Sequence, residues 1–434
     1  MKINKLELRN FRCFEFYELE LAKRFTLLIG DNGSGKTAIL DAIVIATGSF
    51  LLKIPEIKAN EKYSFSYDDV LCDFQIMGQS PIKERSKQAG IMAKGIVNNT
   101  EIQWARFKYA QNPHGLIHNN AFFQLTNQLI KEKSNPSIFF PVIVYYGTDR
   151  LWKKTSSDVE TLPPGSRLLG YEDCLNTAFS LERLFRWFKT QELAALQKQE
   201  RRHVLEAVRE AIVDMIPDAK KAFWDMDLDE LVVEIIIREE LLAMPFHLLS
   251  DGYRNMIGMV ADIAYRMATL NPQLEKDVIK QTEGIVLIDE IDLHLHPKWQ
   301  GIVVERLLNT FPKVQFVAST HSPFIIQSIY QKKDCLLWDL EKNQPLEITS
   351  KSPEDIVEDL QGYPIAAQSR RFLAMEQAAK EYYGVLKQIP PASEEEKQRL
   401  KQRLDELLFP YSDDPAYQAF LKIKRLAVEE NNEK

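Results

Sequence analysis

The chain has 434 residues, 45% of them hydrophobic and 27% charged, and its formal net charge is −7. These values are typical of a globular protein and disfavour a general nucleic-acid coat protein, without excluding a local basic groove. No apolar run reaches the roughly 18 residues of a membrane span, and the first residues lack a signal peptide's apolar block, so we expect a cytoplasmic protein. The four widely spaced cysteines predict reduced thiols, neither disulfides nor a zinc site: Cys13, Cys72, Cys174 and Cys335.

The first part of the chain alternates between strand and helix patterns. Paired apolar residues near the N-terminus predict two short strands with one buried face. Residues 25–29 form a continuous apolar run, which is typical of a strand buried on both faces of a parallel sheet, and a helical pattern follows. Strand patterns recur at 91–109, with a turn at Asn98-Asn99, and at 139–146.

Helical and strand segments also alternate through the rest of the chain. Residues 180–216 have the period of a helix or helical hairpin, and they are too short for a long coiled-coil arm. Strand patterns follow at 230–237, 284–288 and 314–318, and past about residue 350 the chain becomes helical and charged. We therefore expect four parts: an N-terminal lobe with a β subdomain at 1–150, a helical insertion with strands at 151–245, a C-terminal lobe at 246–345 and a helical extension at 346–434.

The first motif is a phosphate loop, Gly30-Asp31-Asn32-Gly33-Ser34-Gly35-Lys36-Thr37, which fits GxxxxGK[ST] and stands between a predicted strand and a predicted helix. Its glycines let backbone N–H groups turn towards a β-phosphate, and the helix N-terminus assists. Lys36 places a positive charge on the β- and γ-phosphates, and the Thr37 hydroxyl suits Mg²⁺. The alternative is a glycine-rich turn without function. The motif in this context predicts ATP and Mg²⁺ as cofactors.

An acidic pair, Asp289-Glu290, follows the buried strand at 284–288. An aspartate at the end of such a strand can hold the Mg²⁺ shell, as a Walker B residue does. The neighbouring glutamate can orient and deprotonate the attacking water. In isolation such a pair would equally serve as a strand cap, and the upstream phosphate loop favours the functional interpretation.

Two weaker motifs draw their meaning from their position. Ser250 and Gly252 precede a predicted helix between the two Walker elements, where an ordinary N-cap and turn would look the same. His321, in Thr320-His321-Ser322-Pro323, follows the last buried strand, where an imidazole could sense a γ-phosphate. The order of phosphate loop, Leu-Ser-x-Gly, Asp-Glu and strand-end histidine is the layout of an ABC-type ATPase head. We therefore expect an α/β fold of the ABC-type ATPase head, with a P-loop sheet flanked by helices, an antiparallel β subdomain, a helical insertion and a helical C-terminal extension. The lobes at 1–150 and 246–345 would be its N-terminal and C-terminal ATPase lobes.

Asp292 and the residues after it stand where this class has its D-loop. His294 and His296 also fall there, and their spacing invites a metal site. Because no matched cysteine or carboxylate cluster accompanies them, we expect structural histidines.

The chain resembles the prokaryotic ATPases related to RecF, SMC and OLD proteins in five segments: Asn10-Phe11-Arg12, Asp31-Asn32-Gly33, Leu249-Ser250-Asp251-Gly252, Leu293-His294-Leu295-His296-Pro297 and Thr320-His321-Ser322-Pro323. Within that group, residues 145–152 and 184–188 look like the ATPase subunits of phage-defence systems of the Septu (PtuA) and retron type.

The resemblance implies a role for each motif residue. Asn32 and Lys36 would bind phosphate, Thr37 and Asp289 would organise Mg²⁺, Glu290 would be the catalytic base, His321 the γ-phosphate sensor, and Ser250, Gly252 and Asp292 would contact the nucleotide of a second subunit. It therefore implies a homodimer around two sandwiched nucleotides. Two departures stand out. Asp251 replaces the glycine of transporters, and no Q-loop glutamine can be chosen between Gln75 and Gln79.

A partner is also implied, because the chain lacks the glutamate and Asp-x-Asp pattern of the Toprim nuclease that OLD-type relatives carry. In the Septu-like arrangement the partner is an HNH nuclease, acting on DNA or another nucleic acid. The C-terminal helices could dock it through an apolar side, or could only pack on their own domain: Phe372, Tyr382, Tyr383 and Leu386. The alternatives are a RecF-like DNA repair ATPase without a toxic partner and a transport ATPase subunit, which the signature and the Thr-His-Ser-Pro segment disfavour.

Overall fold

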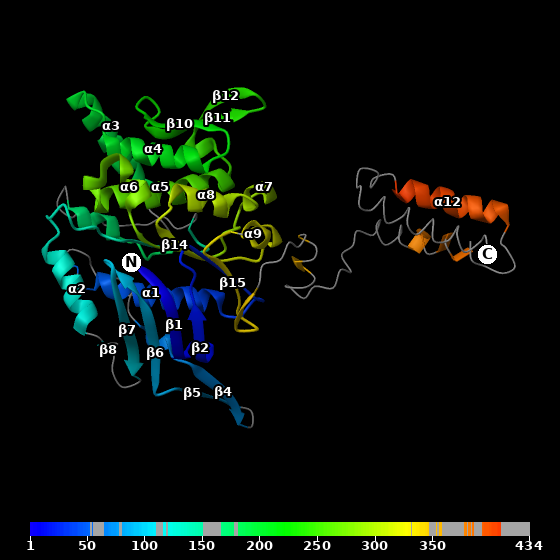
Figure 1. Cartoon of the computed structure of the whole chain (residues 1–434), viewed down its shortest axis with the longest axis horizontal. Helices are drawn as coiled ribbons and strands as arrows, with labels where there is room; N and C mark the ends of the chain where they lie inside the picture. Colours follow the sequence, from blue (N-terminus) through cyan, green and yellow to red (C-terminus); the bar gives the residue numbers. More distant parts are fainter. Residues whose placement is uncertain are drawn as a thin grey trace. The chain divides into compact units, whose positions relative to one another are not determined.

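The computed structural model describes residues 1–52, 54, 65–77, 80–109, 116–118, 120–150, 166–177, 181–330, 332–346 and 393–408, with short stretches between 353 and 385. The chain divides into two units, Met1–Pro353 and Glu354–Lys434. In the second unit the longest described element is α12 (Glu394–Leu408), drawn orange in Figure 1. Of the predicted docking residues there, Phe372, Tyr383 and Leu386 lie outside the described residues.

A six-stranded sheet forms the centre of the first unit. Its strand order is β16-β15-β3-β14-β13-β9, and all neighbours run parallel except the antiparallel edge strand β16. Every residue is buried in the four strands β3 (Phe25–Ile29), β9 (Val142–Tyr146), β13 (Gly284–Ile288) and β14 (Val314–Ser319). Burial on both faces explains the continuous apolar runs in the sequence. The remaining strands are β15 (Cys335–Asp339) and β16 (Gln344–Leu346).

The parallel arrangement brings four strand ends to one edge of the sheet. Ile288 pairs with Tyr146, Ala318 with Leu27 and Ser319 with Leu28, so the segments that follow β3, β9, β13 and β14 leave the sheet together. The predicted strand at 139–146 begins only at Val142. The reason is local: the Phe140 N–H donates to the side chain of Asn271 (2.8 Å), and Pro141 has no N–H to offer the sheet.

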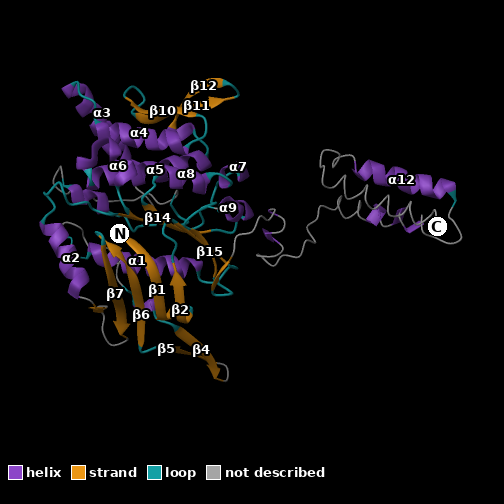
Figure 2. Cartoon of the chain, in the orientation of Figure 1, coloured by secondary structure: helices purple, strands orange, loops and turns teal. Residues whose placement is uncertain are grey.

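An antiparallel sheet, in the order β2-β1-β6-β7-β8, lies on one side of the core. Asn98 and Asn99, with φ of 47° and 62°, form the predicted turn between two of its strands. Helix α1 (Lys36–Leu51) contacts strands of both sheets (Figure 2). The Trp104 indole N–H donates to the Ala46 carbonyl (3.0 Å). The strands are β1 (Lys2–Phe11), β2 (Phe14–Glu20), β6 (Gln88–Val97), β7 (Thr100–Tyr109) and β8 (Leu116–His118).

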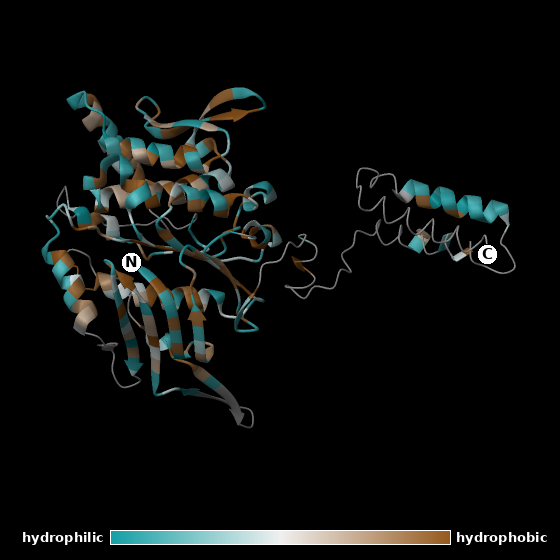
Figure 3. Cartoon of the chain, in the orientation of Figure 1, coloured by the Kyte–Doolittle hydropathy of each residue, from teal (hydrophilic) through white to brown (hydrophobic). Residues whose placement is uncertain are grey.

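Helices cover the opposite face. The predicted helical segment at 180–216 is a pair, α3 (Leu181–Lys198) and α4 (His203–Met215), and α4 packs on the long helix α5 (Asp251–Leu270) (Figure 1). A three-stranded sheet sits outside them: β10 (Ala219–Asp225), β11 (Glu230–Ile237) and β12 (Glu240–Pro245). The pattern at 230–237 predicted β11 alone. Figure 3 shows apolar colouring on the buried core strands and also on the outer β11–β12 hairpin.

The shorter elements complete the unit: β4 (Cys72–Met77), β5 (Ser80–Arg85), α2 (Asn120–Lys131), α6 (Val278–Gln281), α7 (Pro297–Gln300), α8 (Val303–Thr310), α9 (Pro323–Ser328) and the 3-10 turns Tyr67–Asp69, Arg167–Tyr171, Phe246–Leu248 and Pro272–Asp277. Among the described helices, none combines the length and apolarity needed to cross a membrane.

Candidate functional site

The phosphate loop connects β3 to α1 and depends on left-handed glycines. Gly30, Gly33 and Gly35 have φ of 144°, 88° and 98°. A Cβ at Gly35 would lie 2.4 Å from the Phe14 ring, and one at Gly30 would lie 2.7 Å from Ser34 Oγ. Side chains at these positions would therefore both strain the backbone and clash with neighbours.

Three features of this loop fit a bound anion. Lys36 Nζ donates to the carbonyls of Gly30 (2.7 Å) and Asp31 (2.9 Å), so the ammonium already points along the loop. Burial lowers the Lys36 pKa, against the opposing effect of Asp289. The Ser34 hydroxyl is buried and has no hydrogen-bond partner in the described part of the chain, and the space a Cβ at Gly33 would enter is open. A phosphate would supply the acceptor that Ser34 lacks.

Asp289, directly after β13, meets the start of α1. The Thr37 hydroxyl donates to Asp289 Oδ2 (2.8 Å). The Ser319 hydroxyl at the end of β14 donates to Asp289 Oδ1 and accepts from the Glu290 N–H (2.8 Å). A hydroxyl and a carboxylate held together are ligands that Mg²⁺ prefers. No group of three or more His, Cys, Asp or Glu side chains suited to a metal occurs among the residues described.

The predicted signature segment begins α5 and touches the predicted D-loop of the same chain. Ser250 is the exposed N-cap residue, and its side chain makes no capping hydrogen bond. A Cβ at Gly252 would lie 2.7 Å from the His294 carbonyl oxygen. Three residues further on, the Asn255 side-chain N–H donates to the Leu293 carbonyl (3.0 Å). Signature and D-loop therefore form one packed surface.

The remaining predicted residues lie at the same edge of the sheet. Asp292 accepts a hydrogen bond from the Thr320 hydroxyl, which comes just after β14. His321 follows and is exposed. His296 is the N-cap residue of α7, and its Nδ1 accepts from the Lys298 N–H (3.3 Å), a structural use of the kind expected.

Arg150 is a buried residue of the site to which sequence reasoning assigned no role. It is 2% exposed and donates to four acceptors: the carbonyls of Gly147 (3.0 Å), Asp289 (2.7 Å) and Glu290 (2.9 Å), and Asn255 Oδ1 (2.9 Å). Burial lowers the Arg150 pKa to about 10, although Asp289, Asp292 and Glu290 favour its charged form.

In the sequence, Arg150 is distinguished only because it belongs to the 145–152 segment, which carries the family resemblance. That segment begins with the last two residues of β9, the neighbour of β13, its described part ends at Arg150, and its sequence contains no glutamine. Of the two glutamines considered for a Q-loop, Gln75 lies in β4 of a separate two-stranded sheet, and Gln79 falls outside the described residues.

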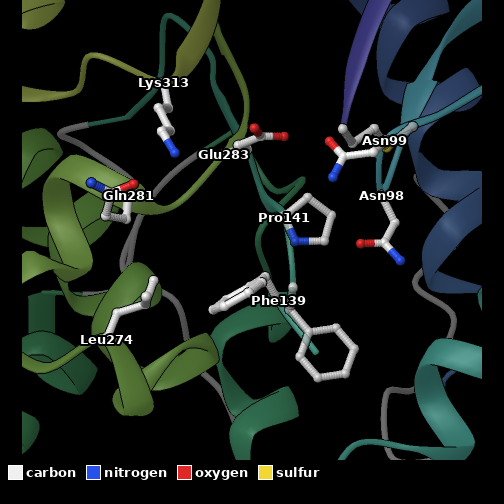
Figure 4. A pocket seen from close by; sticks show the side chains of 10 residues that line it. Asn98, Asn99, Phe139, Pro141, Leu274, Gln281, Glu283 and Lys313 are labelled. Carbon is white, nitrogen blue, oxygen red and sulfur yellow. The ribbon is translucent and has the colours of Figure 1, made fainter. Parts of the chain in front are cut away.

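A separate pocket of about 240 Å³ lies at the opposite edge of the core sheet (Figure 4). Its lining includes Phe139, Pro141 and Glu283, which immediately precede β9 and β13, so it opens at the amino ends of the strands. Ligands of open parallel sheets bind at the carboxyl ends, where the phosphate loop lies. The pocket is therefore distinct from the candidate nucleotide site.

Comparisons with known proteins find ATPase domain models and ATPase relatives. Residues 5–220 match a family model described as an AAA domain, and residues 181–326 match an AAA ATPase domain. Similar proteins include the retron Vc95 probable ATPase of Vibrio cholerae, 26% identical over 75% of this chain and 72% of that protein. The Septu protein PtuA of Bacillus thuringiensis is 25% identical over 75% of this chain and 73% of its own length. An SMC head bound to the C-winged helix domain of ScpA aligns with 82% of this chain and all of that chain, at 17% identity and a TM-score of 0.47.

Proposed function

We propose that this ATP hydrolase, whose chain matches models of AAA-type ATPase domains, works in prokaryotic antiphage defence as a homodimer that binds ATP between two subunits and controls a nuclease partner. The hydrogen bond between Thr37 and Asp289, which closes the phosphate loop onto the Walker B strand, carries the nucleotide part of this proposal. Similarity to retron and Septu ATPases supports the defence part. We place the protein in the cytoplasm.

In this proposal the phosphates of ATP bind at the loop between β3 and α1. Asn32 contacts them from the exposed turn, and Lys36 exchanges the carbonyls of Gly30 and Asp31 for phosphate oxygens. Thr37 and Asp289 would hold Mg²⁺, which supplies positive charge to the phosphate oxygens. The backbone N–H groups and the unpartnered Ser34 hydroxyl complete the cradle.

Hydrolysis would depend on Glu290 and His321. Glu290 stands directly after Asp289, and its N–H is held by Ser319 (2.8 Å). From there its carboxylate would orient the attacking water and accept its proton. His321 lies at the end of the neighbouring strand, where its imidazole would contact the γ-phosphate.

The second half of each site would come from the other subunit. Ser250 is exposed at the N-terminus of α5, and its hydroxyl is not used as a cap, so both the hydroxyl and the helix N-terminus are open to a partner's ATP. Gly252 and Asp292 would lie at the same interface. The expected lobes at 1–150 and 246–345 would then face each other across the dimer.

Exposed apolar side chains support a protein partner. Most of the large exposed apolar residues in the described part of the chain lie between α3 and the segment before α5: Leu193, Leu196, Met226, Leu228, Ile236, Ile237, Leu241, Leu242 and Leu248. Such concentration on one lobe is typical of an interaction surface. The C-terminal helices remain a second proposed docking region.

Glu290→Gln tests the sandwich. This variant should bind ATP, fail to hydrolyse it and accumulate as a dimer, measured by size-exclusion chromatography with light scattering. Adding Ser250→Arg should return the protein to the monomer with ATP binding intact. A Glu290→Gln protein that stays monomeric at saturating ATP and Mg²⁺ would falsify the dimer mechanism.

Co-purification from the native host separates defence from repair. A stoichiometric nuclease bound to the tagged chain supports the hypothesis of a role in defence. A chain that purifies without a nuclease, and whose ATPase activity rises with DNA alone, would instead support the RecF-like alternative.

A further inference from the structure

In the proposed dimer each subunit contributes to two nucleotide sites. Two buried side chains connect the parts of the subunit that form these sites. The phosphate loop and the Asp289–Glu290 pair serve the subunit's own ATP, whereas Ser250 and Gly252 serve the partner's. We propose that Arg150 and Asn255 couple the two nucleotide sites by transmitting movement of the α5 N-terminus to the backbone of Asp289 and Glu290. This inference rests on the proposed sandwich dimer and names the residues that coordinate its two sites.

The Arg150 end of the connection holds the Walker B backbone. Its guanidinium donates to the carbonyls of Asp289 (2.7 Å) and Glu290 (2.9 Å), so it holds both of the peptide units that flank Glu290. Glu290 has a φ of 49°, a conformation that non-glycine residues adopt infrequently. A backbone in this conformation depends on its surroundings, so the two hydrogen bonds help to set where the Glu290 carboxylate points.

The Asn255 end holds the signature and the D-loop. One amide makes both contacts: its oxygen accepts from Arg150 Nε (2.9 Å), and its N–H donates to the Leu293 carbonyl (3.0 Å). Asn255 is 1% exposed and stands three residues after Gly252 on the same helix. Displacement of the α5 N-terminus must therefore displace Asn255 as well.

These contacts are suited to transmitting a movement because breaking any one of them would cost free energy. Arg150 and Asn255 are both buried, so breaking one hydrogen bond would leave an unpaired polar group away from water. The Gly252 backbone also sits against the His294 carbonyl, with only 2.7 Å available to a Cβ, so α5 and the D-loop have little room to slide independently. Signature, D-loop and Walker B backbone are expected to move as one body.

The consequence is cooperative hydrolysis. When ATP on the partner's phosphate loop engages Ser250 and Gly252, the α5 N-terminus takes up its bound position. Asn255 and Arg150 then bring the Glu290 backbone into its catalytic position at the other nucleotide. Both are positioning residues, because each acts through the Walker B backbone and neither contacts ATP itself.

Asn255→Ala tests the connection with a matched control, Tyr146→Phe. The control also removes a buried side-chain hydrogen bond between β9 and α5, from the Tyr146 hydroxyl to Asp262 (2.8 Å). It keeps the main-chain hydrogen bond from the Asp289 N–H to the Tyr146 carbonyl (2.8 Å) and leaves Arg150 and Asn255 in place. ATPase rate against ATP concentration, ATP affinity and thermal stability are measured for both variants and for the wild type. Each substitution is also placed in the Glu290→Gln background to measure ATP-driven dimerisation.

Asn255→Ala should lower kcat by about tenfold and reduce the Hill coefficient to one, while ATP affinity and ATP-driven dimerisation stay at wild-type levels. Tyr146→Phe should lose stability but keep its cooperativity. If Asn255→Ala does not fold, Asn255→Asp, which keeps an acceptor for Arg150 and removes the donor to Leu293, takes its place with the same expectation of lost cooperativity.

Two results would overturn the coupling while leaving the dimer intact: cooperative kinetics in the Asn255 variant matching those of Tyr146→Phe, or a wild type whose own Hill coefficient is one. Failure of Glu290→Gln to dimerise overturns the proposed function itself, and the coupling with it.

Discussion

The Thr37 hydroxyl lies 2.8 Å from Asp289 Oδ2, although the two residues are 252 positions apart in the chain. This hydrogen bond joins the first turn of α1 to the end of β13. It exists because β3, which leads into the phosphate loop, and β13 are separated by a single strand, β14, and all three run in the same direction. The same proximity is what a shared Mg²⁺ would require.

Thr37→Ala should lower Mg²⁺-dependent ATP hydrolysis by about a hundredfold, because the hydroxyl that faces Asp289 is lost. Thr37→Ser keeps the hydroxyl and should retain most of the activity. Nucleotide binding in the presence of EDTA, measured by calorimetry, should be similar in both. Equal rates for the alanine and serine variants would contradict a role for this hydroxyl.

Two inactive variants should regain part of the wild-type activity when mixed. Lys36→Ala removes the ammonium from the phosphate loop, and Ser250→Arg blocks the signature. A heterodimer of the two contains one site with an intact loop from one subunit and an intact signature from the other. Steady-state ATPase of the mixture should therefore exceed that of either variant alone, and purely additive rates would argue against a shared site.

Gly252→Ala should impair hydrolysis more than it impairs the fold. The new Cβ would meet the His294 carbonyl at 2.7 Å and push the signature away from the D-loop. We expect an approximately tenfold lower kcat with ATP affinity unchanged. Gly301→Ala is the matched control, since its Cβ would find no atom closer than 3.7 Å. A Gly252→Ala enzyme as active as Gly301→Ala would refute the tight contact.

Asp262→Ala should reduce the free energy of unfolding by about 3 kcal/mol, because Arg266, 2% exposed and 2.8 Å away, would lose its buried counter-charge. The Tyr146 hydroxyl would lose the shorter of its two hydrogen bonds and keep the one to the Met259 carbonyl (3.3 Å). Chemical denaturation measures the change. Glu182→Ala removes a comparable pair from the surface of α3, with Arg186, and should change stability little.

How far the sequence predicts the fold depends on the type of strand. The runs at 25–29, 284–288 and 314–318 correspond closely to β3, β13 and β14, because strands buried on both faces need apolar residues at every position. Strands β10 and β12 were not predicted from the sequence. The first four residues of β12 are exposed, and its pairing with β11 is a tertiary contact with no regular signal in the sequence.

The candidate site divides in the same way. Its phosphate-loop residues were predictable, since the left-handed turns demand glycine and the lysine and threonine occupy fixed places in the motif. Arg150 was not, because an arginine four residues beyond a strand has no distinguishing local pattern. Its importance comes from burial and from four acceptors contributed by three separate segments.

By itself, the sequence determined the chemistry of this protein: a phosphate loop, an acidic pair and their order along an ATPase chain, all of which are encoded in local residue patterns. Tertiary structure alone decided how those motifs meet. Parallel pairing of β3, β14 and β13 brought Thr37 to Asp289, and burial of Arg150 and Asn255 linked the signature helix to the Walker B backbone. Such contacts arise from strand order and packing across hundreds of residues, which no local pattern records.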